Sequence, residues 1–184
     1  MLPAFALSSI CLAFTLALAP EPPAPDALAP RVRPTTPAAK ALLATGVRRS
    51  QTFARLMQEL EATDVVVYVE TVSDLPAGLD GRLMFMTSAG GVRYLRAQVP
   101  TIGGIDALVA TVGHELQHAL EVAAHPDVRD SADLAMLYRR IGIQGAGKDR
   151  YDTVLARSIG RRVRSELNYQ ASLRSMRGVT NHFS

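Results

Sequence analysis

The stretch from Thr111 to His125 constrains the fold of this chain most strongly, because it contains the pattern H-E-x-x-H, from His114 to His118. On a helix of about 100° per residue, these two histidines lie within about 40° of each other. The opposite side of the same helix is apolar, and it collects Ile105, Leu108, Val109, Val112, Leu116 and Leu120. The stretch is therefore predicted to be an amphipathic helix, with one face against a hydrophobic core and one face carrying imidazoles.

The two histidines are placed to bind one metal ion. Residues four apart on a helix lie one turn above each other, so both imidazoles can converge on the same ion. Zinc is the expected ion, and Glu115 between the histidines is the candidate general base for a metal-activated water. The pattern predicts a zinc metallopeptidase, a hydrolase of peptide or protein substrates. The alternative is an exported metal-binding or interaction module with a degenerate, inactive peptidase fold.

The composition limits which residue types can bind a metal and which partners are expected. The single cysteine, Cys11, lies in the first apolar run, so a metal in the domain must be held by His, Asp and Glu. The net charge of +3 comes from arginines, while aromatic residues make up 5% and tryptophan is absent. A nucleic-acid interface needs a denser basic stripe with stacking aromatics, so no nucleic-acid partner is predicted.

Residues 1–19 are predicted to be a signal peptide or an N-terminal anchor. Positions 2–19 carry no charge and are mostly apolar, and Ala17-Leu18-Ala19 resembles a signal-peptidase site. The protein is therefore expected to be exported (periplasmic or secreted) or to be tethered to a membrane through its N-terminus. Residues 20–37 contain seven prolines and are predicted to be a linker.

Residues 38–175 are predicted to form one folded domain, followed by a polar tail at 176–184. A β-branched run at Val65–Glu70 predicts a buried strand. Two further β-like runs, separated by a pair of glycines, predict a hairpin. The second of these runs, Val92–Val99, mixes polar and apolar residues on both faces, which is typical of a half-exposed strand or an edge strand.

Helical patterns account for the rest of the domain. One covers residues 39–62 with a division at Gly46, and two more follow the motif helix at 130–140 and 151–174. The order of elements predicts an α+β fold. In it a small, mostly antiparallel sheet packs against the motif helix, and further helices lie toward the C-terminus.

The segment His114-Glu115-x-x-His118 resembles the active-site helix of the HExxH zinc metallopeptidases, the zincins. The order of elements over residues 40–170 is similar to the small core of the gluzincin branch. The resemblance implies a zincin-type active-site helix on which the two histidines bind zinc and Glu115 serves as general base and later proton donor. It also implies that an edge strand such as Val92–Val99 aligns the peptide by strand addition.

The third metal ligand is left open between three acidic residues. A gluzincin supplies it from a later helix, and Asp152 opens such a helix, with the small residues Ala156 and Gly160 on the next turns. These small residues would permit close packing on the motif helix, so Asp152 is the predicted ligand. Glu166 and Glu121 are the alternatives, but Glu121 lies about 10 Å along the axis from the first histidine and better suits a place behind the ligands or a place facing the substrate. An ordinary helix N-cap is the competing interpretation of Asp152.

Tyr138 and His125 are candidates for stabilising the negative charge that develops on a carbonyl oxygen, because such sites use a hydrogen-bond donor beside that oxygen. Tyr151, which precedes Asp152, has the same status. A structural role is the favoured interpretation for each of the three.

Overall fold

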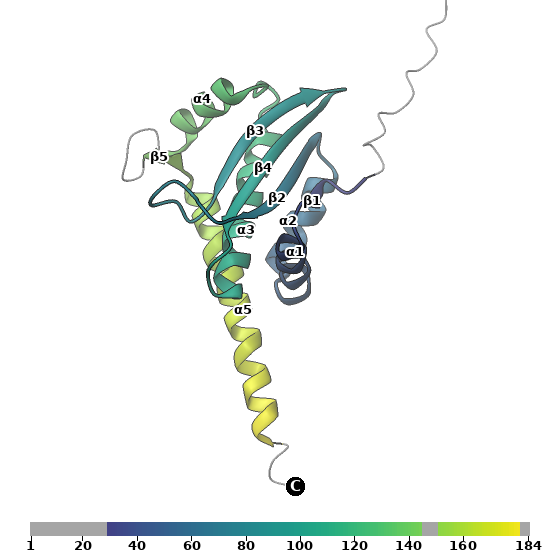
Figure 1. The fold of residues 1–184 in the computed structure, drawn as a ribbon, viewed down its shortest axis with the longest axis vertical. Coiled ribbons are helices and arrows are strands. Elements are labelled where there is room, and N and C mark those ends of the chain that lie inside the picture. Colours follow the sequence, from purple (N-terminus) through teal and green to yellow (C-terminus); the bar gives the residue numbers. More distant parts are fainter. Residues whose placement is uncertain (1–28, 145–150, 181–184) are drawn as a thin grey trace, which may run out of the picture.

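The computed structural model describes residues 29–144 and 151–180, with side chains as far as residue 172. Within these ranges the chain forms five helices, a four-stranded sheet and a two-stranded sheet, which together make an α+β fold (Figure 1). None of the helices described is long and apolar enough to cross a membrane. The predicted signal peptide or anchor at 1–19 lies outside the described residues.

The main sheet is mixed rather than mostly antiparallel. Its strand order is β1-β2-β4-β3, with bounds Val32–Pro34 for β1, Val65–Val72 for β2, Arg82–Ala89 for β3 and Val92–Pro100 for β4. Both β1 and β4 run parallel to β2, whereas the hairpin of β3 and β4 is antiparallel. The prediction of a mostly antiparallel sheet is therefore wrong. Residues 73–81 carry the chain past the position of β4, so β4 returns beside β2 in the same direction as β2.

The linker predicted at 20–37 extends too far, because residues 32–34 form β1. Val32 is buried, and β1 pairs with residues 67–69 of β2. A proline is tolerated at the end of β1 because this strand lies at the edge of the sheet. The pairing is parallel because two helices, α1 (Pro37–Arg49) and α2 (Gln51–Glu61), connect β1 to β2, and parallel neighbours need a crossover of this kind.

β3, and not β4, is the edge strand on the other side of the sheet. β4 lies between β2 and β3, so the expectation that Val92–Val99 is an edge strand is wrong. Its polar residues have partners inside the protein: Arg93 binds Asp64, and Gln98 accepts a hydrogen bond from Arg82 at 2.5 Å. These partners explain why an interior strand carries a mixed polar and apolar pattern.

The N-terminal helical segment is divided at Ser50 rather than at Gly46. Ser50 Oγ accepts a hydrogen bond from Phe53 N at 3.0 Å and caps the start of α2. Gly46 stays inside α1 because the ring of Phe53 packs against it, and a Cβ at Gly46 would lie 2.7 Å from the ring carbons. The glycine therefore marks a close contact between the two helices and not a break.

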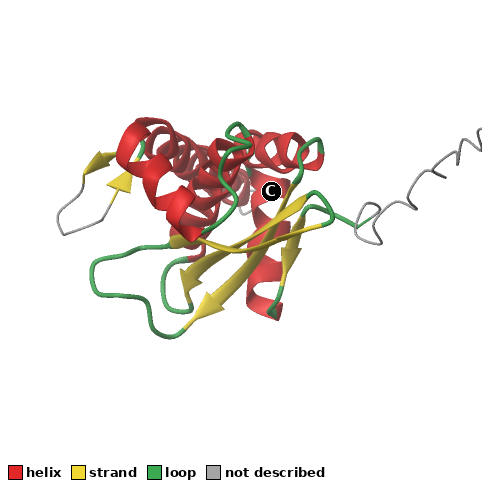
Figure 2. Cartoon of the chain, turned by 90° about the horizontal axis from the view of Figure 1, so that it is seen from above, coloured by secondary structure: helices red, strands yellow, loops and turns green. Residues whose placement is uncertain are grey.

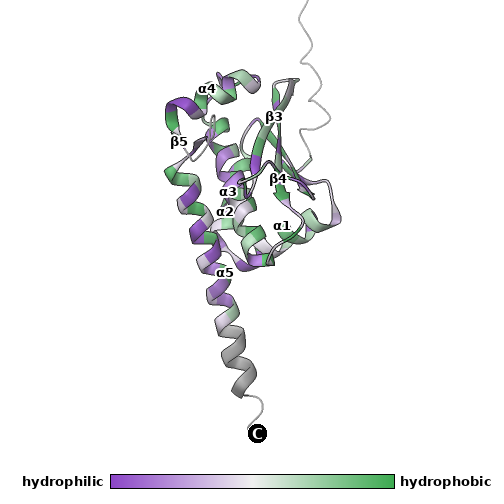
Figure 3. Cartoon of the chain, turned by 60° about the vertical axis from the view of Figure 1, so that its left-hand side comes forward, coloured by the Kyte–Doolittle hydropathy of each residue, from purple (hydrophilic) through white to green (hydrophobic). Residues whose placement is uncertain are grey.

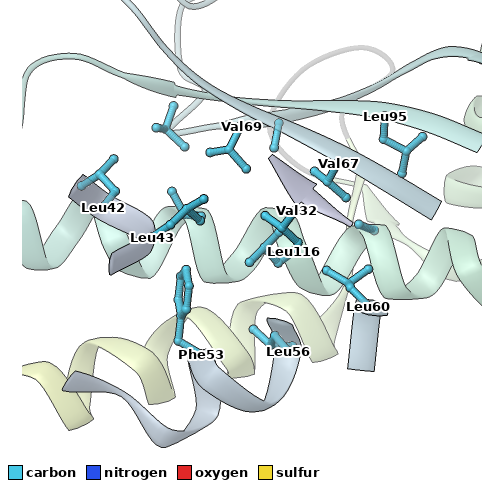
Figure 4. Close-up of a cluster of buried hydrophobic side chains, with 14 of the residues drawn as sticks. Val32, Leu42, Leu43, Phe53, Leu56, Leu60, Val67, Val69, Leu95 and Leu116 are labelled. Atoms are coloured by element: carbon cyan, nitrogen blue, oxygen red, sulfur yellow. The ribbon is translucent and has the colours of Figure 1, made fainter. Parts of the chain in front are cut away.

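The motif helix, α3 (Ile105–Ala123), lies between the sheet and α2. Figure 4 shows Leu116 of α3 with Val67 and Val69 of β2 on one side and Phe53 and Leu56 of α2 on the other. All five side chains are at most 2% exposed. Burial of one such side chain contributes about 1.5–3 kcal/mol, so the core holds α3 from both sides.

Two helices and a short strand pair complete the described chain. Their bounds are Ser131–Ile141 for α4, Ile143–Gln144 for β5, Tyr151–Asp152 for β6 and Val154–Thr180 for α5. β5 and β6 are antiparallel and lie apart from the main sheet (Figure 2). α5 extends beyond the body of the domain (Figure 1). Because this helix includes residues 176–180, the polar tail predicted at 176–184 begins too early.

α5 packs closely on α3, as the small residues of its first turns predict. Ala156 is fully buried, and a Cβ on Gly160 would lie 3.3 Å from His114 Cβ. Gly113 on α3 permits the same close approach of the two helices, since a Cβ there would lie 3.1 Å from Val163 Cγ2. Residues without bulk at these positions let the two helix backbones approach each other.

Arg93 fixes the end of α3 to the sheet. Its side chain is 5% exposed, and Nη1 donates to Val122 O at 2.8 Å and to His125 O at 2.7 Å. Nε and Nη2 bind the two carboxylate oxygens of Asp64 at 2.8 and 2.7 Å. The last carbonyl groups of a helix lack partners within it, so the guanidinium satisfies them. Its hydrogen bonds also lower the pKa of the Asp64 carboxyl.

Replacement of Arg93 by methionine is expected to lower the free energy of unfolding by about 3 kcal/mol, because buried carbonyl groups lose their donor. Arg96→Met on the same strand is the matched control, with an expected change within about 0.5 kcal/mol. The Arg96 side chain is 38% exposed and forms a long ion pair, of 3.8 Å, with Glu70. Urea unfolding followed by circular dichroism measures both changes, and equal losses would contradict the role given to Arg93.

Candidate metal centre

His114 and His118 direct their Nε2 atoms toward the same point beside α3. The two nitrogens are 3.1 Å apart, and the rings meet edge to face with centroids 4.7 Å apart. In a neutral imidazole one nitrogen accepts and the other donates, so the two nitrogens can share one N–H···N hydrogen bond. Both nitrogens point at the position that a metal ion would occupy.

Asp152 completes a group of three candidate ligand atoms. Its Oδ1 lies 3.3 Å from His114 Nε2 and 3.4 Å from His118 Nε2. With the 3.1 Å between the nitrogens, the three atoms form a nearly regular triangle. Ligand atoms about 2.0–2.1 Å from a tetrahedral zinc ion are separated by about 3.3–3.4 Å, so the triangle has a suitable size. The group could hold a metal ion.

Hydrogen bonds hold the Asp152 carboxylate in place. Oδ1 accepts from Thr153 N at 2.7 Å, and Oδ2 accepts from Arg157 Nε at 2.7 Å. Burial acts to raise the pKa of the Asp152 carboxyl, but the hydrogen bonds from His114, His118 and Arg157 outweigh burial and lower it. The carboxylate is therefore ionised at neutral pH, as a metal ligand must be.

A further carboxylate orients the ring of His118. Glu121 Oε2 accepts from His118 Nδ1 at 2.8 Å, and Glu121 Oε1 accepts from Thr153 Oγ1 at 2.6 Å. Carboxylate partners of this kind fix the orientation of metal-binding histidines. Glu121 thus lies behind the candidate ligands, which is one of the two places that its distance along the helix suggests. Thr153 Oγ1 also accepts from Ala156 N at 3.0 Å, so Thr153, and not Asp152, caps α5.

Burial and hydrogen bonding act in opposite directions on His118. The residue is 6% exposed, which favours the neutral ring. The hydrogen bonds to Asp152 and Glu121 and the charge of Glu115 outweigh this and raise the pKa of His118 to about 9. In the absence of a cation the ring therefore holds a proton between two carboxylates. A metal ion binding here takes the place of that proton, because metal-bound histidine is neutral.

Glu115 is buried close to the two histidines. It is 4% exposed and borders the same cleft. Gly81, in the loop before β3, leaves room for it: a Cβ on Gly81 would lie 2.6 Å from Glu115 Oε1 and 2.7 Å from Thr111 Cγ2. Burial raises the pKa of the Glu115 carboxyl, although the charges of His118 and His114 oppose the shift. A carboxylate with a raised pKa is a better proton acceptor near neutral pH.

An open cleft of about 1060 Å³ gives access to these groups. Its walls are formed by α3, by the loop before β3 and the start of β3, by α4 and by the first three turns of α5. Residues on these walls include Leu79, Leu83, Leu108, Tyr138, Arg161 and Arg164. This volume lies slightly above the usual range for small-molecule sites, so the cleft can accept a segment of peptide.

Two of the three acidic candidates are engaged elsewhere. Glu166 accepts from Ser50 Oγ and Thr52 Oγ1, both at 2.6 Å, and from Thr52 N at 3.0 Å, so it closes the start of α2. Burial acts to raise the pKa of Glu166, but these hydrogen bonds lower it. Both oxygens of Glu121 are bound by His118 and Thr153. The structure therefore brings Asp152 to the histidines and leaves the alternatives without a free carboxylate.

The candidates for an oxyanion donor differ in their positions. Tyr138 borders the cleft, and its ring meets His118 edge to face at 5.0 Å, but its hydroxyl donates to His118 O at 3.2 Å. Burial raises the pKa of Tyr138, so this hydroxyl stays protonated. His125 donates through Nδ1 to Glu121 O at 2.7 Å and is not among the described residues that border the cleft. Tyr151 does border it.

Comparison with protein-family models, with curated proteins and with solved structures finds no match to this chain. The resemblance to the zincins therefore stays a prediction.

The candidate ligands could be identified from the sequence, but the residues that position them could not. Thr153 orients Glu121, Arg157 holds Asp152, and Gly81 makes room for Glu115. Thr153 has a recognisable signal, since a threonine before a helical run is a common N-cap. Gly81 has no such signal, because its contact joins two segments far apart in the sequence.

Asp152→Ala is expected to abolish stoichiometric zinc binding, because it removes one of three ligands and leaves two imidazoles facing each other. Glu166→Ala on α5 is the matched control. It should retain zinc while lowering the free energy of unfolding by about 1–2 kcal/mol, through loss of the cap on α2. Metal content after dialysis, measured by mass spectrometry, separates the two variants. Zinc retained by Asp152→Ala and lost from Glu166→Ala would reverse the assignment.

Proposed function

We propose that the protein is a zinc-dependent metallopeptidase that hydrolyses peptide bonds in the cleft beside α3. In this proposal His114, His118 and Asp152 hold the metal, and Glu115 is the general base. The observation that carries the proposal is the triangle of the two Nε2 atoms and Asp152 Oδ1, with edges of 3.1, 3.3 and 3.4 Å. A buried glutamate stands next to it, in a cleft open to substrate.

The donor set supports zinc over other common metal ions. Two imidazole nitrogens suit zinc and related transition metals, whereas calcium and magnesium prefer larger sets of oxygen ligands. Three protein ligands with an open fourth position are typical of catalytic zinc, while structural zinc has four protein ligands. When bound, zinc supplies a Lewis acid that polarises a carbonyl oxygen and acidifies water.

Glu115 moves the protons in the proposed reaction. Its carboxylate can take a proton from the attacking water and deliver it to the leaving amine, and the raised pKa that burial gives it suits both transfers. The other residues keep the site in shape. Glu121 holds the His118 ring, and Arg157 holds Asp152. Tyr138 supports the backbone of α3 through its hydroxyl, so we assign it a structural role.

Glu115→Gln tests the proposal directly. The variant should bind zinc as the unchanged protein does, because Glu115 is not a ligand, while peptide hydrolysis should fall by about 100-fold or more with loss of the general base. Cleavage of an unstructured protein and of a quenched fluorescent peptide measures activity, and mass spectrometry measures zinc. Removal of zinc by a chelator should abolish cleavage, and added zinc should restore it.

Two results would count against a peptidase. Purified protein that takes up no zinc would contradict the metal centre. Protein that binds zinc but cleaves no peptide would instead support a metal-binding module with an inactive site.

Gly81→Ala should lower activity without removing zinc, because the added methyl group displaces the Glu115 carboxylate from beside the histidines. Misplacement of a reacting group by about 1 Å can cost roughly 100-fold in rate, so a loss of at least tenfold in kcat is expected. Gly104→Ala is the control. Gly104 directly precedes α3, which also borders the cleft, and a Cβ there would meet no atom within 4 Å. Unchanged kcat in Gly81→Ala would show that Glu115 tolerates the displacement.

A further inference from the structure

We propose that the substrate carries a carboxylate close to the scissile bond, and that it binds to a row of three arginines on α5: Arg157, Arg161 and Arg164. The inference rests on the proposed peptidase function and names the class of peptide that the cleft prefers. The carboxylate is either the side chain of an aspartate or glutamate or the free C-terminus of the peptide.

The three arginines form a row along one face of α5 and all border the cleft. Spacings of four and three residues place them within about 60° of one another around a helix. Arg157 begins the row at the metal centre, because its Nε donates to Asp152 Oδ2 at 2.7 Å. From there the row extends about 10 Å to Arg164, the length of about three residues of extended peptide.

Two members of the row are available to a ligand. Arg161 and Arg164 are exposed, and neither forms a hydrogen bond or ion pair with any residue in the described ranges. Arg162 behaves differently, since it faces away from the row and lies 3.8 Å from Glu166. Hydrophilic residues recur along the coloured part of α5 (Figure 3), but these arginines are the ones that the fold places on the cleft.

The charge of the cleft also favours an anionic ligand. Five arginines border it, against three acidic residues. Two of these acids, Glu115 and Asp152, belong to the candidate metal centre. Among the described cleft residues this leaves Asp80 as the acid away from the centre. A bound divalent cation would make the cleft more positive still.

The guanidinium group points to a carboxylate as the matching chemistry. Its planar fork donates two parallel hydrogen bonds to a carboxylate, whereas an amide of the same shape offers one acceptor and no charge. A lysine or arginine side chain of a peptide would be repelled by the row. The structure therefore assigns α5 a role in selecting acidic peptides, in addition to supporting Asp152.

Matched peptides test this assignment on the zinc-loaded full chain. Each pair differs by glutamate against glutamine at one position within three residues of the cleaved bond, and each peptide is made with a free and an amidated C-terminus. The carboxylate is expected to raise kcat/KM by about fivefold to tenfold at one position or at the free C-terminus, and the preference should weaken in high salt. A preference that persists with amidated peptides identifies a side chain, and one that requires the free end identifies the C-terminus.

The variant R161A/R164A should lose this preference, so that it cleaves the glutamate and glutamine peptides with equal kcat/KM. R162A is the matched control and should keep the preference. R161E/R164E should favour a lysine peptide over the glutamate peptide. Equal cleavage of glutamate and glutamine peptides by the unchanged protein, or a preference that survives in R161A/R164A, would overturn the assignment.

Binding separates failure of this inference from failure of the peptidase proposal. If zinc-loaded protein cleaves no peptide, fluorescence anisotropy of labelled glutamate and glutamine peptides still measures selection by the row. Tighter binding of the glutamate peptide that is lost in R161A/R164A supports the arginine site on its own. Equal binding of the two peptides contradicts it.

Discussion

The close contact between α3 and α5 determines whether this protein can hold a metal ion at all. Two candidate ligands lie on α3 and the third immediately precedes α5, so the separation of the helices sets the size of the ligand triangle. Gly160 and Ala156 permit the approach at one end. Further along, Glu166 binds the start of α2, and Arg49 Nη2 donates to Leu167 O at 3.0 Å. The site is thus built between two helices that are clamped at several points, which limits the freedom of each ligand.

This packing largely buries the side chains of His118, Glu121 and Glu115, and hydrogen bonds offset the cost for His118 and Glu121. A buried charge without a partner costs several kcal/mol, so each group near the histidines needs a counterpart. The chain of contacts runs from Thr153 through Glu121 to the His118 ring, and from there to Asp152. Glu115 departs from this arrangement, because burial dominates its environment and raises its pKa. Perturbed groups of this kind are commonly kept for chemistry rather than for stability.

Local patterns explain what the sequence could predict. The histidine pair and the apolar stripe repeat with the period of one helix, so both faces of α3 follow from residue spacing. Asp152 could be selected because small residues follow it at helical intervals, and the structure brings it to the histidines. β1 could not be predicted, because a strand of three residues shows no periodicity. Its pairing partner, β2, lies beyond two helices in the sequence. The interior position of β4 could not be predicted either, since the groups that bind the Arg93 side chain lie far from it in the sequence.

The pairing of Asp152 with Gly160 has a consequence for how this sequence can change. Aspartate is one methylene shorter than glutamate, and it reaches the histidines because Gly160 lets α5 lie against His114. A larger residue at 160 would push the helices apart and leave the short carboxylate out of reach. The short side chain at 152 and the absence of a side chain at 160 therefore depend on each other. Proteins that share a common ancestor with this one are expected to change both positions together rather than one at a time.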